Sequence, residues 1–225
     1  MSRYGLSLKR WFLSYRDFSR PFNELIAQPL PAGKTCFRDA EIVSLDIETT
    51  GLDAGTADIL SVGWVVIRGG KVDLSTAESH IVRPRGAVGG SAAIHGLTDT
   101  AVQSGVDWTV ALGKIIVVLT GRALLVHHAG LDKALLDRLC KQQFGAPLLV
   151  PVIDTLALEN RRQRRRHHVE ANQSLRLADI RDRYRLPRYA AHDCLVDAIA
   201  TAELLMAMLA HNDGAERTSL GDLYS

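Results

Sequence analysis

Four carboxylates and one imidazole in this sequence could together hold metal ions and move a proton: Asp46, Glu48, Asp132, Asp197 and His192. Carboxylate oxygens are the ligands that hard divalent cations prefer. Because the set contains no cysteine and a single histidine, Mg²⁺ or Mn²⁺ fits it better than Zn²⁺. Histidine titrates closest to neutral pH, so His192 could accept a proton beside the ions. The set therefore predicts a carboxylate site for two divalent cations.

The first two acids belong to a predicted strand. Residues 41–47, EIVSLDI, have the apolar and β-branched content of a buried strand. Side chains alternate along a strand, so Asp46 and Glu48 are expected to project from the same face. Two like charges placed there raise each other's pKa, and a cation would compensate them. The strand then ends at a turn, where Gly51 gives the backbone conformational freedom.

Asp132 follows a second predicted strand. Residues 123–126 form a short apolar run typical of a central strand. Leucines recur at helical spacing over residues 131–144, which places Asp132 in the first turn of a helix, near the strand end where open α/β sheets bind ligands. The neighbouring His127 and His128 face opposite sides of the chain, which favours packing or hydrogen bonding over a shared metal ion.

The last two candidates lie at the start of a long helix, whose apolar stripe runs from Val196 to Met208. Asp193 is the expected N-cap. Five helical residues turn through about 500°, so His192 and Asp197 cannot share a helical face. His192 is therefore expected to precede the helix, on a loop that folds back over Asp197.

Three segments, taken in order, resemble the exonuclease motifs of the DEDDh, or DnaQ-like, 3′-5′ exonucleases: Asp46-Ile47-Glu48-Thr49-Thr50-Gly51, Asp132, and His192 with Asp197. Residues 94–97 (IHGL) and 154–156 (DTL) are similar to further segments of that family. The resemblance covers residues 40–210, and joint occurrence in order is more specific than any one motif. The family usually has Asn in place of His128 and often Phe in place of Leu131.

This resemblance implies a ribonuclease-H-like fold and a metal-dependent exonuclease that releases nucleoside 5′-monophosphates from the 3′ end of single-stranded or frayed DNA. It implies two cations, Mg²⁺ or Mn²⁺. By analogy, Asp46 contacts both ions, and Glu48 and Asp197 share the ion on the nucleophile side. Asp132 acts mainly through the groups that surround the ion ligands or through a water, and His192 takes the proton from the attacking water.

Substrate contacts are expected just past the first metal strand and, by resemblance, at one distant histidine: Thr49, Thr50, Gly51, Leu52 and His95. Thr50 and Gly51 are equally typical of a plain turn. Two other functions stay open. One is an exoribonuclease or oligoribonuclease acting on RNA 3′ ends. The other is a noncatalytic, polymerase-associated nucleic-acid-binding subunit, although the presence of all five principal residues argues against it.

The remaining pattern predicts an α/β fold with a mixed sheet of about five strands, the first three antiparallel, flanked by helices. Two strands joined at Gly69-Gly70 follow the first metal strand as a hairpin. Further along, a helix is expected over residues 108–119 and a strand over residues 149–153. Two more helices complete the predicted order.

We divide the chain into an amphipathic extension (1–40), the exonuclease domain (41–211) and a tail (212–225). The extension carries Trp11, Phe12, Leu13 and Tyr15 among basic residues. It is expected to be a helix packed on the domain, or else an arm that contacts a DNA polymerase, another protein or a membrane. The basic run 161–168, RRQRRRHH, is either a solvated segment or a site of phosphate attraction.

Composition fits one soluble globular domain, with 47% hydrophobic and 23% charged residues. The formal net charge of +2 does not by itself indicate a nucleic-acid binder. The three cysteines are scattered and lack zinc-site spacing, which suits a reducing cytoplasm. The sequence shows no signal-peptide core and no apolar run of membrane-spanning length, so a cytoplasmic protein without a membrane partner is expected.

Overall fold

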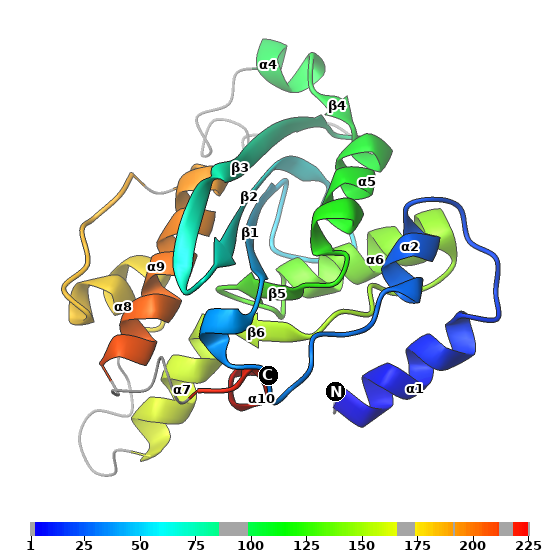
Figure 1. The fold of residues 1–225 in the computed structure, drawn as a ribbon. Coiled ribbons are helices and arrows are strands. Elements are labelled where there is room, and N and C mark those ends of the chain that lie inside the picture. Colours follow the sequence, from blue (N-terminus) through cyan, green and yellow to red (C-terminus); the bar gives the residue numbers. More distant parts are fainter. Residues whose placement is uncertain (1–2, 86–98, 166–173, 191, 212–217, 225) are drawn as a thin grey trace.

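The computed structural model describes residues 3–85, 99–165, 174–190, 192–211 and 218–224. In this part of the chain a six-stranded sheet has the order β4-β3-β2-β1-β5-β6 (Figure 1). Its strands are β1 (Ile42–Thr49), β2 (Ile59–Arg68), β3 (Lys71–Arg83), β4 (Val106–Asp107), β5 (Ala123–Val126) and β6 (Val152–Asp154).

Strand directions confirm the predicted mixed sheet. β1, β2 and β3 pair in antiparallel fashion, whereas β5 is parallel to β1 and β6 is parallel to β5. The two-residue strand β4, parallel to β3, adds a sixth member at the edge that the pattern did not predict. Gly69 and Gly70 join β2 to β3 with φ angles of 60° and 68°, and this left-handed backbone is the one that a tight hairpin turn requires.

Helices cover both faces of the sheet (Figure 1). They are α1 (Arg3–Leu13), α2 (Phe22–Ala27), η1 (Phe37–Asp39), α4 (Asp99–Gln103), α5 (Trp108–Leu119), α6 (Asp132–Phe144), α7 (Thr155–Arg165), α8 (Leu177–Arg183), α9 (Cys194–Ala210) and α10 (Leu220–Leu223). One apolar core joins α2, α5 and α6 to the sheet, and a second joins α9 and α10 to its other face.

Alternation along β1 separates these two cores. The odd-numbered residues 43–47 are buried in the core that contains α5 and α6. On the other face, the Ser44 hydroxyl donates a hydrogen bond of 2.7 Å to the Ala198 carbonyl oxygen of α9. Asp46 and Glu48 follow Ser44 at two-residue spacing, so they project toward the α9 side as the strand period requires.

The strand predicted over residues 149–153 is placed wrongly by the sequence pattern. β6 begins at Val152, although Leu149 and Val150 are buried. Pro151 explains the shift, because proline has no N–H to donate to a sheet ladder. Its carbonyl oxygen still accepts a bond of 2.9 Å from the Leu124 N–H.

The two ends of the chain contact the sheet domain. Leu6, Phe18 and Phe22 join the core that contains α5 and α6. Near the other end, Leu220 and Leu223 of α10 are buried in the core that contains α9. The division into extension, domain and tail stays a prediction. Within the described ranges, no helix is both long enough and apolar enough to cross a membrane.

Candidate active site

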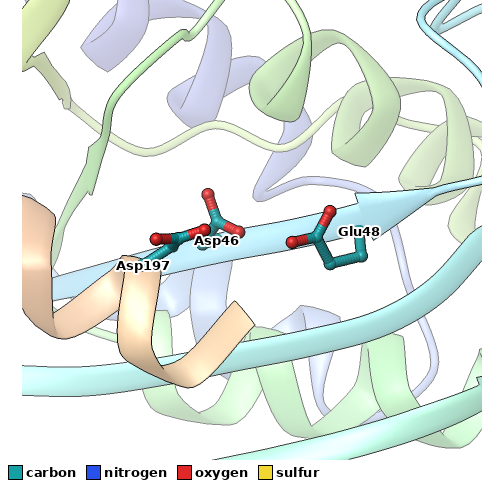
Figure 2. Close-up of side chains that lie close together, drawn as sticks. All are labelled: Asp46, Glu48 and Asp197. Atoms are coloured by element: carbon teal, nitrogen blue, oxygen red, sulfur yellow. The ribbon is translucent and has the colours of Figure 1, made fainter. Parts of the chain in front are cut away.

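Three carboxylates meet where β1 faces the start of α9 (Figure 2). Asp46, Glu48 and Asp197 each offer one oxygen, and these oxygens lie within 4.8 Å of one another. Asp46 and Asp197 are half-buried, and Glu48 is buried. Such a group of oxygen donors, drawn from two elements far apart in sequence, is suited to hold a hard divalent cation.

Gly63 allows α9 to approach the sheet closely at this point. Gly63 of β2 pairs with Asp46 of β1. A Cβ atom on Gly63 would lie 2.5 Å from the Leu195 backbone N and 2.6 Å from the Cys194 carbonyl carbon. Sequence reasoning missed this residue. The available signal was an isolated glycine inside a strand, which often marks a close backbone approach.

We expect Gly63→Ala to weaken both folding and catalysis. The added methyl group must push the first turn of α9 away from β1, which costs about 1–3 kcal/mol of unfolding free energy. Asp197 moves with that turn, and a displacement of about 1 Å at a reacting centre can cost about 10²-fold in rate. Thermal unfolding and initial digestion rates measure the two effects.

Gly113→Ala is the matched control for this substitution. Gly113 lies inside α5, where a Cβ atom would meet no atom within 4 Å. Alanine is the better helix former, so this change should raise the unfolding free energy by about 1 kcal/mol and leave digestion unchanged. Equal stability and activity in Gly63→Ala and Gly113→Ala would contradict the packing account.

Asp132 lies beside the three carboxylates. It is the first residue of α6, follows the β5 exit and is buried. Its charge and that of Asp46 repel each other, since Asp132 is the leading charged group that raises the pKa of Asp46. Its own oxygens are not part of the group that lies within 4.8 Å. All four predicted acids therefore gather in one region, with three of them in closest contact.

Burial and mutual repulsion hold these acids in an unfavourable state. Burial raises the pKa of Asp46 well above its ordinary value, and neighbouring negative charges raise it further. Burial, followed by the charges of Asp154 and Glu48, raises the pKa of Asp132 to about 7. Burial also raises the pKa of Asp197. Positive charge at this point would relieve all of these penalties.

The metal-free protein should therefore lose stability as pH rises from about 4 to about 7. Across this window the native state holds protons that the unfolded state has released, because aspartate titrates near 3.8 when unfolded and Asp132 near 7 when folded. The unfolding free energy then falls with increasing pH. Melting curves in the presence of a chelator, at pH values from 4 to 8, measure this fall.

Asp132→Asn should flatten that dependence, since an amide does not titrate. Asp53 is exposed and Asp73 is partly exposed, and hydrogen bonds from Gly55 and Ser75 respectively lower their pKa values. The stability that these two acids contribute is lost only below about pH 4, so it does not compete in this window. A metal-free melting temperature that rises steadily from pH 4 to pH 7 would show that the acids are not repelling one another.

His192 precedes α9, as the spacing argument predicted. Asp193 caps the helix by accepting bonds from the Leu195 and Val196 N–H groups at 2.9 and 3.1 Å. The His192 backbone N–H donates to Asp197 Oδ2 at 3.0 Å, which ties this loop to the carboxylate group. His192 is exposed and has φ of 71°, a left-handed conformation that is uncommon for residues other than glycine and clusters at functional sites.

Hydrogen bonds close the loop that follows β1. The Thr49 hydroxyl donates to the Gly51 carbonyl at 2.6 Å, and Thr50 exchanges two hydrogen bonds with Asp58. Leu52 is 89% exposed. A side chain on Gly51 would meet no atom within 4 Å, and its φ is not left-handed, so this turn does not itself require glycine. The predicted contact His95 lies outside the described residues.

His127 and Asp154 have structural roles that the sequence did not assign in detail. His127 Nε2 lies 2.9 Å from the Leu175 carbonyl oxygen, and Nδ1 lies 2.7 Å from the Thr155 hydroxyl. A carbonyl can only accept, so the proton sits on Nε2 and Thr155 donates to Nδ1. Asp154 accepts from the N–H groups of Ala129 and Leu156. Together these bonds fix the β5 exit that leads to Asp132.

A cavity of about 1110 Å³ adjoins the carboxylate group. His128, His192 and Asp197 line it together with the segment around α8. The basic residues of α7 are not among those that line it. α7 begins directly after β6, and Leu156 in its first turn lines the cavity. The arginines of α7 lie in its second half, away from that end.

Comparison with known families decides the class of protein. The family model for RNase_T, described as an exonuclease, matches residues 43–205. The chain belongs to this exonuclease family. The predicted membership in the DEDDh exonucleases and the prediction of a nuclease are both confirmed, and the matched region contains all five principal residues. Members of the family generally use divalent metal ions, which agrees with the carboxylate group.

Curated relatives are much longer than this exonuclease. It is 29% identical over 172 residues to "DNA polymerase III PolC-type" of Thermotoga maritima, a match that covers 76% of this chain and 12% of the relative. The corresponding protein of Caldanaerobacter subterraneus is 27% identical over the same length and with the same coverage. The chain thus spans about an eighth of the length of these relatives.

Solved structures of nucleases share its fold. E. coli Exonuclease I in complex with a dT13 oligonucleotide superposes with a TM-score of 0.67 at 15% identity, covering 77% of this chain and 42% of that chain. Exonuclease X in complex with 5′ overhanging duplex DNA gives a TM-score of 0.59 at 21% identity and covers 81% of this chain and 99% of that chain. These similarities confirm the predicted ribonuclease-H-like architecture.

Proposed function

We propose that this exonuclease hydrolyses DNA from a free 3′ end, single-stranded or frayed, and releases nucleoside 5′-monophosphates with the help of two divalent cations. The observation that carries the proposal is the convergence of Asp46, Glu48 and Asp197 within 4.8 Å, beside the buried Asp132. The DNA polymerases among its relatives and the DNA-bound nucleases of the same fold favour DNA over RNA as the substrate.

The residues present suit Mg²⁺ or Mn²⁺. All four acids offer hard oxygen donors, and the raised pKa values of Asp46, Asp132 and Asp197 favour positive charge at this point. Two such cations would activate a water for attack on phosphorus and stabilise the departing 3′ oxygen. Asp46 would hold both ions, Glu48 and Asp197 would hold the ion on the nucleophile side, and Asp132 would act mainly through the groups around the ions or through a water.

His192 is the proposed proton acceptor for the attacking water. Its backbone N–H donates to Asp197, and His192 is one of the residues that line the cavity beside the carboxylates. An exposed imidazole can release the proton to solvent after each cycle. Thr49 to Leu52 and His95 are the proposed contacts to the terminal nucleotide, and the adjoining cavity has room for a nucleotide.

Digestion of end-labelled oligonucleotides tests this function. The purified protein with Mn²⁺ should shorten single-stranded DNA stepwise from its 3′ end and release monophosphates, and a chelator should stop the reaction. Matched substrates with mismatched, paired, phosphorylated and RNA 3′ ends separate the alternatives. Faster digestion of the RNA end would favour the exoribonuclease, and intact substrates throughout would refute the nuclease proposal.

Mn²⁺ should also raise the melting temperature. A cation that binds only the folded state at 100 times its dissociation constant adds about 2.7 kcal/mol to the unfolding free energy. For a chain of this size that corresponds to roughly 5–10 °C. Asp46→Asn should blunt the rise, because it removes a charge from the centre of the group. A melting curve that Mn²⁺ leaves unchanged would count against the carboxylate site.

A further inference from the structure

Helix α1 has two different faces. Leu6 and Arg10 are buried, and Leu13 packs against the core that contains α5 and α6. The opposite face presents Leu8, Trp11 and Phe12 to solvent, and Tyr15, in the turn that follows the helix, continues their line; the exposed fractions of the four side chains lie between 53% and 73%. Their positions i, i+3, i+4 and i+7 follow one stripe of the helix, the spacing with which a helix inserts into a groove on a partner.

Arg10 fixes this helix to the domain. Its guanidinium donates to the Leu149 carbonyl oxygen at 2.8 Å and to the Ile26 carbonyl oxygen at 3.1 Å. It also donates to the carbonyl oxygens of Leu25 and Gln28. A buried guanidinium that bonds to four carbonyls from two other segments leaves α1 little freedom to swing away. The exposed stripe is therefore held in place before any partner binds, which lowers the entropy cost of binding.

The stripe lies away from the candidate active site. Arg10 contacts Leu149, which precedes the first residue of β6. β6 runs parallel to β5, and β5 runs parallel to β1, so the start of β6 and the carboxylate-bearing end of β1 lie toward opposite ends of the strands. Figure 1 shows α1 beyond α2, on the side of the sheet opposite to α9. A molecule on α1 would leave the catalytic residues accessible.

Charge around the stripe selects the kind of occupant. Lys9 and Arg16 flank the aromatic residues and are exposed, and the sequence from residue 3 to residue 16 contains no acid. A second copy of the same face would set positive charge against positive charge. A partner whose apolar groove has an acidic rim would complement both the stripe and its flanks.

We propose that the outer face of α1 docks this exonuclease on a DNA polymerase subunit through an apolar groove rimmed by acidic side chains. The choice of a polymerase rests on the proposed function and on relatives in which the matched segment is 12% of a DNA polymerase chain. α1 precedes the region that the exonuclease family model matches, residues 43–205. The contact would tether the nuclease to the polymerase and leave the end of β1 that carries the carboxylates free to bind DNA.

Binding of the intact protein to the purified replicative polymerase subunit of the same organism tests this proposal. Trp11→Ala combined with Phe12→Ala should weaken the dissociation constant by at least about 30-fold, since large aromatic side chains dominate such interfaces. Lys9→Glu combined with Arg16→Glu leaves the apolar stripe unchanged. This variant should associate with the polymerase more slowly than the wild type, and its association rate should depend less on salt concentration. Leu74→Ala removes a leucine that is 63% exposed on β3 and should bind like the wild type.

Digestion of a free oligonucleotide, measured on the same preparations, keeps the two proposals apart. Normal digestion with lost polymerase binding in the aromatic variant supports docking through α1. If that variant binds the polymerase as tightly as the wild type does, the proposal is overturned. It is also overturned if the wild-type protein does not bind the polymerase but uses the same residues to dimerise or to bind anionic vesicles. Absence of digestion by the wild type would refute the nuclease proposal, whereas polymerase binding would still report on α1.

Discussion

Asp46→Asn is expected to lower the turnover of 3′-end digestion by at least about 10³-fold. Removal of a single preorganised group that stabilises developing charge already costs about 10²–10³-fold. Asp46 lies at the centre of the carboxylate group and is the proposed ligand of both cations, so its loss should exceed that range. The substitution keeps the shape of the side chain and removes only its charge. Steady-state digestion with saturating Mn²⁺ measures the effect.

Stability should change in the opposite direction. In the metal-free protein, Asp46→Asn removes a half-buried acid whose pKa is raised by burial and by four neighbouring acids. The variant should therefore melt at a temperature equal to or above that of the metal-free wild type at pH 7. Asp39→Asn, which changes an exposed acid of η1, is the matched control and should alter neither property. Wild-type turnover in Asp46→Asn would remove Asp46 from the proposed mechanism.

The strand period and helix signals predicted most of the geometry around these acids. Alternation along β1 correctly placed Asp46 and Glu48 on one face, because a buried strand leaves each side chain only two directions. The 100° step of a helix correctly separated His192 from Asp197 and put His192 before α9. The glycine pair at the β2–β3 turn was equally clear, since few other residues adopt its backbone angles.

Long-range packing accounts for what the sequence could not predict. Nothing near Gly63 indicates that α9, more than 130 residues later in the chain, will pack its backbone against that glycine. In the same way, the charge of Asp154 raises the pKa of Asp132 only because β5 and β6 are neighbours. The start of β6 was missed because apolar content outweighed the missing N–H of Pro151 in the prediction.

The edge of the sheet shows the same limit. β4 is two residues long, and a segment so short has no period that a pattern could detect. The sequence predicted an amphipathic helix within residues 1–40, and α1 is such a helix. The sequence did not predict which side of this helix would be buried. That choice depends on Arg10, whose carbonyl partners at Leu25 and Leu149 come from separate segments. Sequence period defines the faces of an element, whereas tertiary contacts select between them.

Replacement of His192 should lower turnover by about 10²–10⁴-fold, the range expected for loss of a positioned proton acceptor. His192→Asn is the most informative variant. Asparagine tolerates the left-handed backbone that His192 adopts at φ of 71°, whereas alanine at this position adds strain. Asparagine cannot accept a proton near neutral pH. Single-turnover digestion with saturating Mn²⁺ separates the chemical step from product release.

The Mn²⁺-dependent rise in melting temperature should survive this substitution. His192 contacts Asp197 through its backbone N–H, which asparagine retains, so the carboxylate group keeps its geometry. His211→Asn, at the exposed far end of α9, controls for the loss of a histidine and should digest DNA normally. A His192→Asn protein that digests at the wild-type rate would assign the proton to another acceptor. One that lost both turnover and the Mn²⁺ response would give His192 a role in holding the site together, because proton transfer alone leaves metal binding intact.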